Sequence, residues 1–283
     1  MSRRNISDYV RPPSLEEAWE KIEAGDGAVR VLSGGTDLTI SAPPEMTTLV
    51  DLASCLDRAI ERLDDGSIRI GAMTTLTDML TSPVLAGHAS GVVAEMLADV
   101  GNPLLRNLSS IGGHVARGRL SDVVPVLIAL DAQIGIYRGK SARLPLARYY
   151  DEEIHKTPNV VTELVLPALA VPTASAFIRF ARTAFDFPML NVCCRARLDG
   201  HLVTDVRIVC GATPLLAQRA RDAEAWIIEH GLRSRAMSTA ARMAREEVVT
   251  RTGWVASAEY RSHLVEVLVE RCLTETARRL EGP

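Results

Sequence analysis

Two pairs of adjacent glycines constrain this chain more than any other feature. Ser33–Leu38 reads Ser-Gly-Gly-Thr-Asp-Leu and follows the short apolar run Val29–Leu32, and Ser110–Gly113 reads Ser-Ile-Gly-Gly. Glycine accepts a positive φ and lets a backbone approach a ligand closely. Successive N–H groups in such turns form concave nests for phosphate oxygens. Two such loops predict one extended anionic ligand held at two points, which favours a bulky diphosphate cofactor over a catalytic side chain.

Each glycine pair also has a plainer interpretation, a tight turn beside a strand. The pattern is not the dinucleotide fingerprint, which needs G-x-G-x-x-G at the start of a helix and an acidic residue about 20 positions further on. The lysine of a Walker A motif is also missing. If a nucleotide binds here, its diphosphate lies in the loops of a different fold.

The composition is that of an ordinary globular protein and excludes several functions. The 283 residues are 47% hydrophobic and 24% charged, with a net charge of −3, whereas a nucleic-acid partner needs a basic face. No apolar run is long enough for a membrane span. The segment Met1–Asp8 lacks the apolar core of a secretory signal, so we expect a cytoplasmic protein.

The cysteines and histidines do not form a metal or catalytic motif. Five cysteines is an odd number, which argues against a disulfide framework in a chain without a signal. No C-x-x-C pair occurs, and the adjacent Cys193 and Cys194 would point to opposite faces of a strand. We expect buried thiols and no metal site. No H-E-x-x-H or G-x-S-x-G pattern points to a hydrolase, and no catalytic side chain is predicted.

The first part of the chain mixes predicted helices and strands. Ser14–Glu17 is a capping box at the start of a helix that Gly25 ends. Alternating or continuous apolar runs predict the strands 29–32, 48–52, 67–72, 134–137 and 161–166, and helical spacing predicts the helices 92–100 and 123–130.

A second α+β unit is expected after a linker. Ala168–Ala174 carries two prolines, and we place a boundary near residue 170. Alternation over 192–198 and 206–210, with the turn Asp199–Gly200, predicts a hairpin. Helices are expected over 217–229 and 238–249, and a long final helix from about Ser257.

Taken in order, the motifs of the chain resemble those of the FAD-binding (medium) subunit family of molybdenum hydroxylases. Carbon monoxide dehydrogenase flavoproteins and the flavin domain of xanthine dehydrogenases belong to this family. The segments that carry the resemblance are Ser33–Leu38, Arg69–Leu76, Arg106–Asn107, Ser110–Gly113, Pro125–Asp131, Arg182–Asp186, Gly211–Pro214, Ser257–Arg261 and Leu268–Arg271.

The resemblance implies an α+β fold with two domains. Residues 1–168 would form a two-lobed PCMH-type FAD-binding domain, with lobes of about 1–55 and 56–168 and FAD stretched between them. Residues 172–283 would form a smaller α+β domain, an antiparallel sheet with helices, like the C-terminal domain of carbon monoxide dehydrogenase flavoproteins.

The resemblance also implies a set of FAD-binding residues. The first loop would hold the diphosphate through backbone N–H groups, and the second group would grip the cofactor from the other side. The first set is Arg30, Val31, Leu32, Ser33, Gly34, Gly35, Thr36, Asp37 and Leu38, and the second is Gly101, Ser110, Gly112, Gly113 and His114. Two further residues are Asp122, near the ribityl or adenosine hydroxyls, and Leu164, on a strand beside the isoalloxazine.

Two of these assignments have alternatives. Arg30 is either a counter-charge for the diphosphate or a solvated surface charge. Asp122 either binds FAD or caps the helix that begins at Val123. The chain also departs from the family after the second glycine pair, where Arg117 and Arg119 replace small residues and a proline step is missing. These arginines either alter or weaken FAD binding or pair with the diphosphate.

As a family member, the chain would be an FAD-dependent oxidoreductase subunit. Its FAD would accept electrons from iron–sulfur centres of a partner and pass them to an external acceptor. The implied partners are a small iron–sulfur subunit and a large molybdopterin subunit, assembled as a dimer of heterotrimers. The alternatives are a stand-alone flavin oxidoreductase of a biosynthetic pathway and a degenerate member without FAD. Neither the substrate nor the electron acceptor follows from the sequence.

Overall fold

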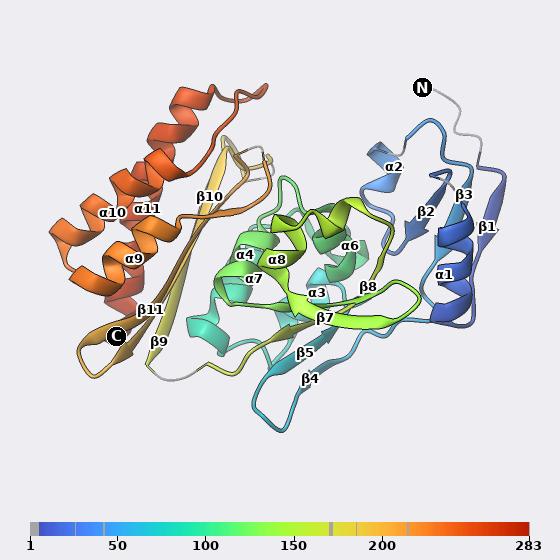
Figure 1. The fold of residues 1–283 in the computed structure, drawn as a ribbon, viewed down its shortest axis with the longest axis horizontal. Coiled ribbons are helices and arrows are strands. Elements are labelled where there is room, and N and C mark those ends of the chain that lie inside the picture. Colours follow the sequence, from blue (N-terminus) through green and yellow to red (C-terminus); the bar gives the residue numbers. More distant parts are fainter. Residues whose placement is uncertain are drawn as a thin grey trace. The chain divides into compact units, whose positions relative to one another are not determined.

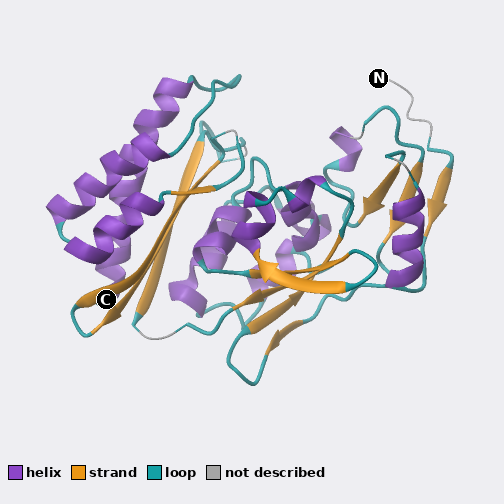
Figure 2. Cartoon of the chain, viewed as in Figure 1, coloured by secondary structure: helices purple, strands orange, loops and turns teal. Residues whose placement is uncertain are grey.

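The computed structural model describes residues 6–25, 27–41, 43–169, 172–184, 186–213 and 215–282. Some residues named in the sequence analysis lie outside the described residues. These are residues 1–5 of the segment Met1–Asp8, residues 170 and 171 of the expected linker, and Phe185 and Pro214 of the segments that resemble the family. Helices and strands are mixed along the chain (Figure 2), which confirms the expected α+β class.

The chain forms two compact units that interleave along the sequence. Unit 1 contains Met1–Met79, Gly101–Arg117 and Gln133–Leu166. Unit 2 contains Leu80–Val100, Gly118–Ala132 and Pro167–Pro283. Each unit is described separately below.

The first sheet of unit 1 is parallel, with the order β1-β3-β2. Its strands are β1 (Asp8–Val10), β2 (Val29–Leu32) and β3 (Thr48–Asp51), and helix α1 (Leu15–Ala24) packs against it. As the capping box predicted, the Ser14 hydroxyl accepts the Glu17 N–H at 3.2 Å, and Gly25 ends the helix. Ala18 and Trp19 of α1 are buried in one cluster with Val50 and Leu52.

The second sheet of unit 1 is antiparallel, with the order β4-β5-β8-β6-β7. The strands are β4 (Ile60–Arg62), β5 (Ile68–Gly71), β6 (Gln133–Tyr137), β7 (Ser141–Pro145) and β8 (Val160–Leu166). The three central strands match the predicted ones closely. The edge strands β4 and β7 were missed because they are mostly exposed and therefore lack the apolar alternation that marks a half-buried strand.

Short helices connect these strands. They are α2 (Leu38–Ser41), α3 (Leu76–Thr81), α5 (Pro103–Leu108), α6 (Ile111–Arg117), α8 (Leu146–Asp151) and the 3₁₀ helix η2 (Ile154–Lys156). Helix α2 begins at Leu38, shortly after the first glycine pair, and α6 contains the second pair. The first glycine pair thus precedes a helix, whereas the second lies inside one. This difference decides whether their N–H groups are open to a ligand.

Unit 2 is built on an antiparallel sheet with the order β12-β11-β10-β9. The strands are β9 (Thr173–Phe180), β10 (Leu190–Asp199), β11 (Leu202–Gly211) and β12 (Gln218–Arg219), and the helices are η1 (His88–Gly91), α4 (Val92–Ala98), α7 (Val123–Ala129), α9 (Arg221–His230), α10 (Ser234–Glu247) and α11 (Ala258–Leu280). Helices α9, α10 and α11 cover one face of the sheet (Figure 1). That face carries Val192, Cys194 and Ala196, as their alternation predicted.

Two expectations in this region were wrong. The helix expected from residue 217 begins only at Arg221, because Gln218 and Arg219 pair with Cys210 and Val209 as strand β12. The expected linker is shorter than Ala168–Ala174, because Thr173 already pairs with Arg197 at the start of β9. In both places strand pairing across the sheet overrides the local sequence signal.

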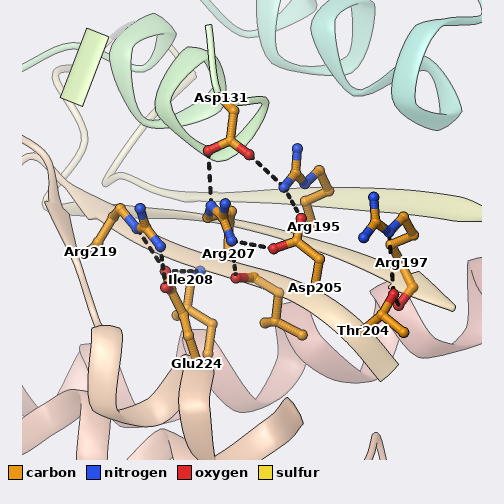
Figure 3. A network of polar contacts seen from close by, with 10 residues as sticks. Asp131, Arg195, Arg197, Thr204, Asp205, Arg207, Ile208, Arg219 and Glu224 are labelled. Atoms are coloured by element: carbon orange, nitrogen blue, oxygen red, sulfur yellow. Dashed lines mark hydrogen bonds and ion pairs between the residues drawn. The ribbon is translucent and has the colours of Figure 1, made fainter. Parts of the chain in front are cut away.

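The opposite face of this sheet is tied to the end of α7 by ion pairs (Figure 3). Asp131, just after α7, accepts from Arg195 Nη2 at 2.7 Å and from Arg207 Nε at 2.9 Å. These two arginines lie directly opposite each other on β10 and β11, and both also contact Asp205. Because two carboxylates neutralise the arginine pair, the end of α7 is held on the sheet. This contact explains why Gly118–Ala132 belongs to unit 2.

Candidate functional site

The first glycine pair forms a half-buried loop between β2 and α2. Gly35 has a φ of +69°, a conformation that favours glycine. The carbonyls of Gly35 and Asp37 accept the N–H groups of Thr39, Ile40 and Ser41 and so start α2. Within the described residues, the backbone N–H groups of Ser33–Asp37 donate to no acceptor. These N–H groups are therefore open to a ligand with phosphate oxygens.

The second glycine pair differs from the expected loop, because Gly112 and Gly113 lie in the first turn of α6. Neither has a positive φ. The N–H of Ile111 donates to Thr74 O, that of Gly112 to Ala72 O, and that of Gly113 to Ser110 Oγ. Since these donors are used within the protein, the second pair is not a nest for an anion.

Close packing explains why residue 112 is glycine. A Cβ at Gly112 would lie 2.8 Å from Ala72 Cβ and 2.9 Å from Ala72 O. The segment that follows β5 and the start of α6 are therefore in direct backbone contact. This contact joins the family-like segments Arg69–Leu76 and Ser110–Gly113 into one structure.

The structure brings the first loop and the α5–α6 region together. Ser33 Oγ donates to Ser110 Oγ at 2.6 Å, and Thr36 Oγ1 lies 3.2 Å from Ser109 Oγ. A Cβ at Gly34 would lie 1.8 Å from Leu108 O. Ser109 was missed in the sequence, where the only available signal was its place in the Ser109–Ser110 pair. The expectation that both motifs belong to one site is thus compatible with their contacts, although only the first offers open N–H groups.

An ion pair also connects these two segments. Arg117, the last residue of α6, has its Nε 3.0 Å from Asp37 Oδ1, and Asp37 Oδ2 accepts from Ser41 Oγ at 2.8 Å. One turn before Arg117, burial and the positive charge of Arg117 lower the pKa of the half-buried His114 to about 4. His114 is therefore neutral near pH 7, and Arg117 carries the positive charge of α6.

Arg30 is turned to other partners. Its Nη1 donates to the carbonyls of Gly27 and Val29, and its Nη2 lies 3.7 Å from Glu45 Oε1. The guanidinium group of Arg30 is thus bound near Gly27, at the start of β2. Val31 and Leu32, at the other end of the strand, lead directly into the open loop.

Gly101 and Leu164 also lie in unit 1. Gly101 has a φ of +58° and precedes α5, where its carbonyl accepts from Arg106 Nη1 at 3.3 Å. Leu164 pairs with Ile70 and Ile134 in the centre of the five-stranded sheet, and its side chain is fully buried. The role of both residues toward a cofactor stays a prediction.

Asp122 belongs to unit 2, whereas the other candidate residues belong to unit 1. Its Oδ1 accepts from Asn191 Nδ2 at 2.7 Å and its Oδ2 from Arg179 Nε at 3.2 Å. Burial raises its pKa, against these two partners. The alternative that Asp122 caps the following helix is wrong, because Ser121 Oγ accepts the N–H groups of Val123 and Val124.

Other features of the described residues are weaker candidates for a ligand-binding site. A cavity of about 490 Å³ in unit 1 is lined by Arg69, Arg143, Asp57 and Glu163, which are paired with one another. Within the described residues, no three His, Cys, Asp or Glu side chains gather as metal ligands. No described helix has the length and hydropathy needed to cross a membrane. The loop Ser33–Leu38 is therefore the candidate site with the clearest chemistry.

An α+β scaffold with a loop of open N–H groups, a neighbouring arginine and a glycine-bearing helix is the kind of site that binds a phosphate-bearing ligand. The chain belongs to the family described as the FAD binding domain in molybdopterin dehydrogenase, which residues 4–172 match. Residues 175–276 match the family described as the CO dehydrogenase flavoprotein C-terminal domain. These matches confirm the resemblance drawn from the sequence and its cofactor, FAD.

Individual relatives match over nearly their whole length. The chain is 25% identical to the putative xanthine dehydrogenase FAD-binding subunit of Escherichia coli, over 98% of each chain. It is 26% identical to the 6-hydroxypseudooxynicotine dehydrogenase complex subunit alpha of Paenarthrobacter nicotinovorans, over 96% of this chain and 95% of that one. A solved carbon monoxide dehydrogenase from Hydrogenophaga pseudoflava has the same fold, with a TM-score of 0.86 at 24% identity over 96% and 97% of the two chains.

Proposed function

We propose that this chain is the FAD-carrying electron-transfer subunit of a molybdenum-containing hydroxylase or dehydrogenase. The observation that carries the proposal is the order and extent of the two family matches, which follow each other over residues 4–172 and 175–276. Bound FAD would take electrons from iron–sulfur clusters of a partner and pass them to an external acceptor, while the protein binds and orients the cofactor.

Within the chain, we propose that residues 1–168 form the FAD-binding domain, with lobes of about 1–55 and 56–168, and that residues 172–283 form the C-terminal domain. The open N–H groups of Ser33–Asp37 support the first loop as the diphosphate site. Gly101, Ser110 and His114 would complete the site from the α5–α6 side, and Leu164 from the sheet. If Asp122 also binds FAD, its carboxylate must accept a hydrogen bond from the cofactor in addition to those from Arg179 and Asn191.

The names of the relatives support partner subunits. One is called a subunit of a dehydrogenase complex, and others are called a medium subunit and a medium chain. By analogy we propose a small iron–sulfur subunit and a large molybdopterin subunit as partners, assembled as a dimer of heterotrimers in the cytoplasm. The substrate would be converted on the large subunit.

The first test is an absorbance spectrum of the purified chain, followed by identification of the flavin released on denaturation. Flavin bands at about 370 and 450 nm with release of FAD are expected. A colourless chain that also fails to take up added FAD would contradict the cofactor role. Purification from the native cells tests the partners: the complex should contain iron and molybdenum in fixed ratio to FAD, and a metal-free single chain with FAD would instead favour a stand-alone flavoprotein.

A further inference from the structure

We propose that Arg117 is the residue that supplies positive charge to the cofactor diphosphate, and that Asp37 competes with the diphosphate for it. This inference rests on the proposed FAD-binding function. Nothing in the family description or the names of the relatives assigns a role to Arg117, which stands where the chain departs from the family pattern.

The position of Arg117 carries the first step. Its guanidinium Nε is 3.0 Å from the carboxylate of Asp37, and Asp37 ends the stretch of five open N–H groups that begins at Ser33. The guanidinium and these N–H groups therefore lie at the same loop. Together they match the needs of a diphosphate, since backbone donors fix the oxygens and an arginine forms charge-assisted hydrogen bonds to phosphate.

The other basic residues near the loop are committed elsewhere, which is the second step. Arg30 donates to Gly27 O and Val29 O, and Arg106 donates to Gly101 O at 3.3 Å. His114 is neutral near pH 7, because its pKa is lowered to about 4. Arg119, the other arginine of the altered segment, is exposed, whereas Arg117 contacts the loop through Asp37. Of the two arginines in the altered segment, the structure therefore favours Arg117.

The pair is also suited to a change of partner. Its side chains are 26% and 39% exposed, so water can solvate the charges when they separate. Asp37 keeps a second partner, the Ser41 hydroxyl at 2.8 Å, so its carboxylate retains a hydrogen bond if Arg117 turns to a phosphate. In this arrangement Asp37 competes with the cofactor for Arg117, and its negative charge opposes the diphosphate.

This competition predicts that substitutions of Arg117 and of Asp37 change the Kd for FAD in opposite directions. In flavin-fluorescence titrations of the full-length chain, stripped of cofactor, Arg117→Gln should raise the Kd for FAD about 10- to 100-fold. The same variant should leave the Kd for riboflavin, which has no phosphate, unchanged. Asp37→Asn keeps the size of the side chain and removes the competing charge, so it should lower the Kd for FAD about 2- to 5-fold. Arg117→Lys should recover part of the lost affinity, because it restores the charge without the planar fork.

The control is Arg148→Gln, which removes an exposed ion pair with Glu152 in the same unit and should leave every Kd unchanged. If Arg117→Gln and Asp37→Asn weaken FAD binding equally, or if riboflavin binding falls with FAD binding, the pair is only a structural link and the inference is overturned. If the wild-type chain binds no FAD, the proposed function itself fails. Because wild-type binding is measured separately, the two failures are distinguishable.

Discussion

The Asp37–Arg117 pair of unit 1 and the Asp122–Arg179 pair of unit 2 use the same two side chains in different surroundings. In the first pair the carboxylate is 39% and the guanidinium 26% exposed, whereas in the second they are 8% and 9% exposed. Water can replace the partner of a half-exposed charge at low cost, but not that of a buried one. The open pair is thus suited to exchange partners on ligand binding, and the buried pair is suited to hold elements together.

The buried pair belongs to a larger set of contacts across the two family segments. Asp122 and Asp131 precede and follow α7, and their partners Arg179, Arg195 and Arg207 lie on β9, β10 and β11. Arg279 of α11 likewise pairs with Glu95 of α4 at 2.9 Å. The acids all come from the segment that matches the FAD-binding family; Arg179, Arg195 and Arg207 come from the segment that matches the C-terminal family, and Arg279 lies three residues after it. The sheet of unit 2 therefore depends on residues from both segments.

The largest effect is expected when the buried pair is broken. Among the described residues, Arg179→Ala leaves the buried Asp122 carboxylate with Asn191 as its remaining partner, and such a loss costs about 3–5 kcal/mol of unfolding free energy. The measurement is urea unfolding followed by circular dichroism, with Arg148→Ala as the exposed control, for which a change below about 0.5 kcal/mol is expected. A loss below about 1 kcal/mol for Arg179→Ala would mean that Asp122 is well solvated, and the contrast between the pairs would fail.

The second effect tests how the open site is built. Gly34→Ala would place a Cβ 1.8 Å from Leu108 O, and because that oxygen belongs to backbone, the loop or α5 must move. We expect a cost of about 2–3 kcal/mol together with loss of FAD retention. The matched control is Gly87→Ala, where a Cβ would meet no atom within 4 Å. Unchanged stability and FAD content in Gly34→Ala would show that the loop does not need its contact with Leu108.

Much of this fold could be predicted from local patterns, and the reasons for the failures are physical. Helix α1, the central strands and the β10–β11 hairpin carry strong local signals, namely a capping box, apolar alternation and an Asp-Gly turn. Strand β12 and the start of β9 depend on pairing partners, which no local pattern reveals. The glycines of α6 were misread because a Gly-Gly pair does not distinguish a nest from close packing between backbones.

The sequence singled out candidate residues for the site, but it could not predict their contacts. The first loop was identified from Ser33–Leu38 alone, whereas the Asp37–Arg117 pair joins residues far apart in sequence. Asp122 shows the opposite problem: its residue type fits a cofactor acid, but the structure surrounds it with Asn191 and Arg179. Which acid meets which arginine is decided by tertiary packing, so sequence alone left both alternatives open.

The third effect distinguishes the two regions by their response to acid. The pKa of His114, beside the open pair, is lowered from 6.5 to about 4 by burial and by Arg117. The free energy of unfolding that depends on a neutral His114 is therefore fully present above pH 6.5 and is lost as the pH falls toward 4. The reason is that His114 of the unfolded chain binds its proton at a higher pH than His114 of the folded chain. Burial raises the pKa of Asp122, so the folded chain takes up that proton first, and this contribution grows as the pH falls.

His114→Gln removes the first contribution and checks its sign. In urea unfolding at pH 7 and at pH 4.5, the wild type should lose about 1–2 kcal/mol more than the variant, a value that allows for solvent screening of a half-buried ring. Arg148→Gln, which removes an exposed ion pair in the same unit, is the control and should show the same pH dependence as the wild type. Equal pH dependence in wild type and His114→Gln would mean that the imidazole is well solvated.

The smallest effect on stability is expected at the open pair. Arg117→Gln should lower the free energy of unfolding by about 0.5 kcal/mol, since both charges regain water when the pair is lost. The small difference should shrink further at 1 M salt, where the Debye length falls to about 3 Å. Urea unfolding at low and high salt measures it, beside Arg179→Ala. If Arg117→Gln cost about 3 kcal/mol, as expected for a buried pair, Arg117 could not leave Asp37 for a ligand. A small loss of stability with a large loss of FAD affinity is the combination that separates a binding residue from a structural one.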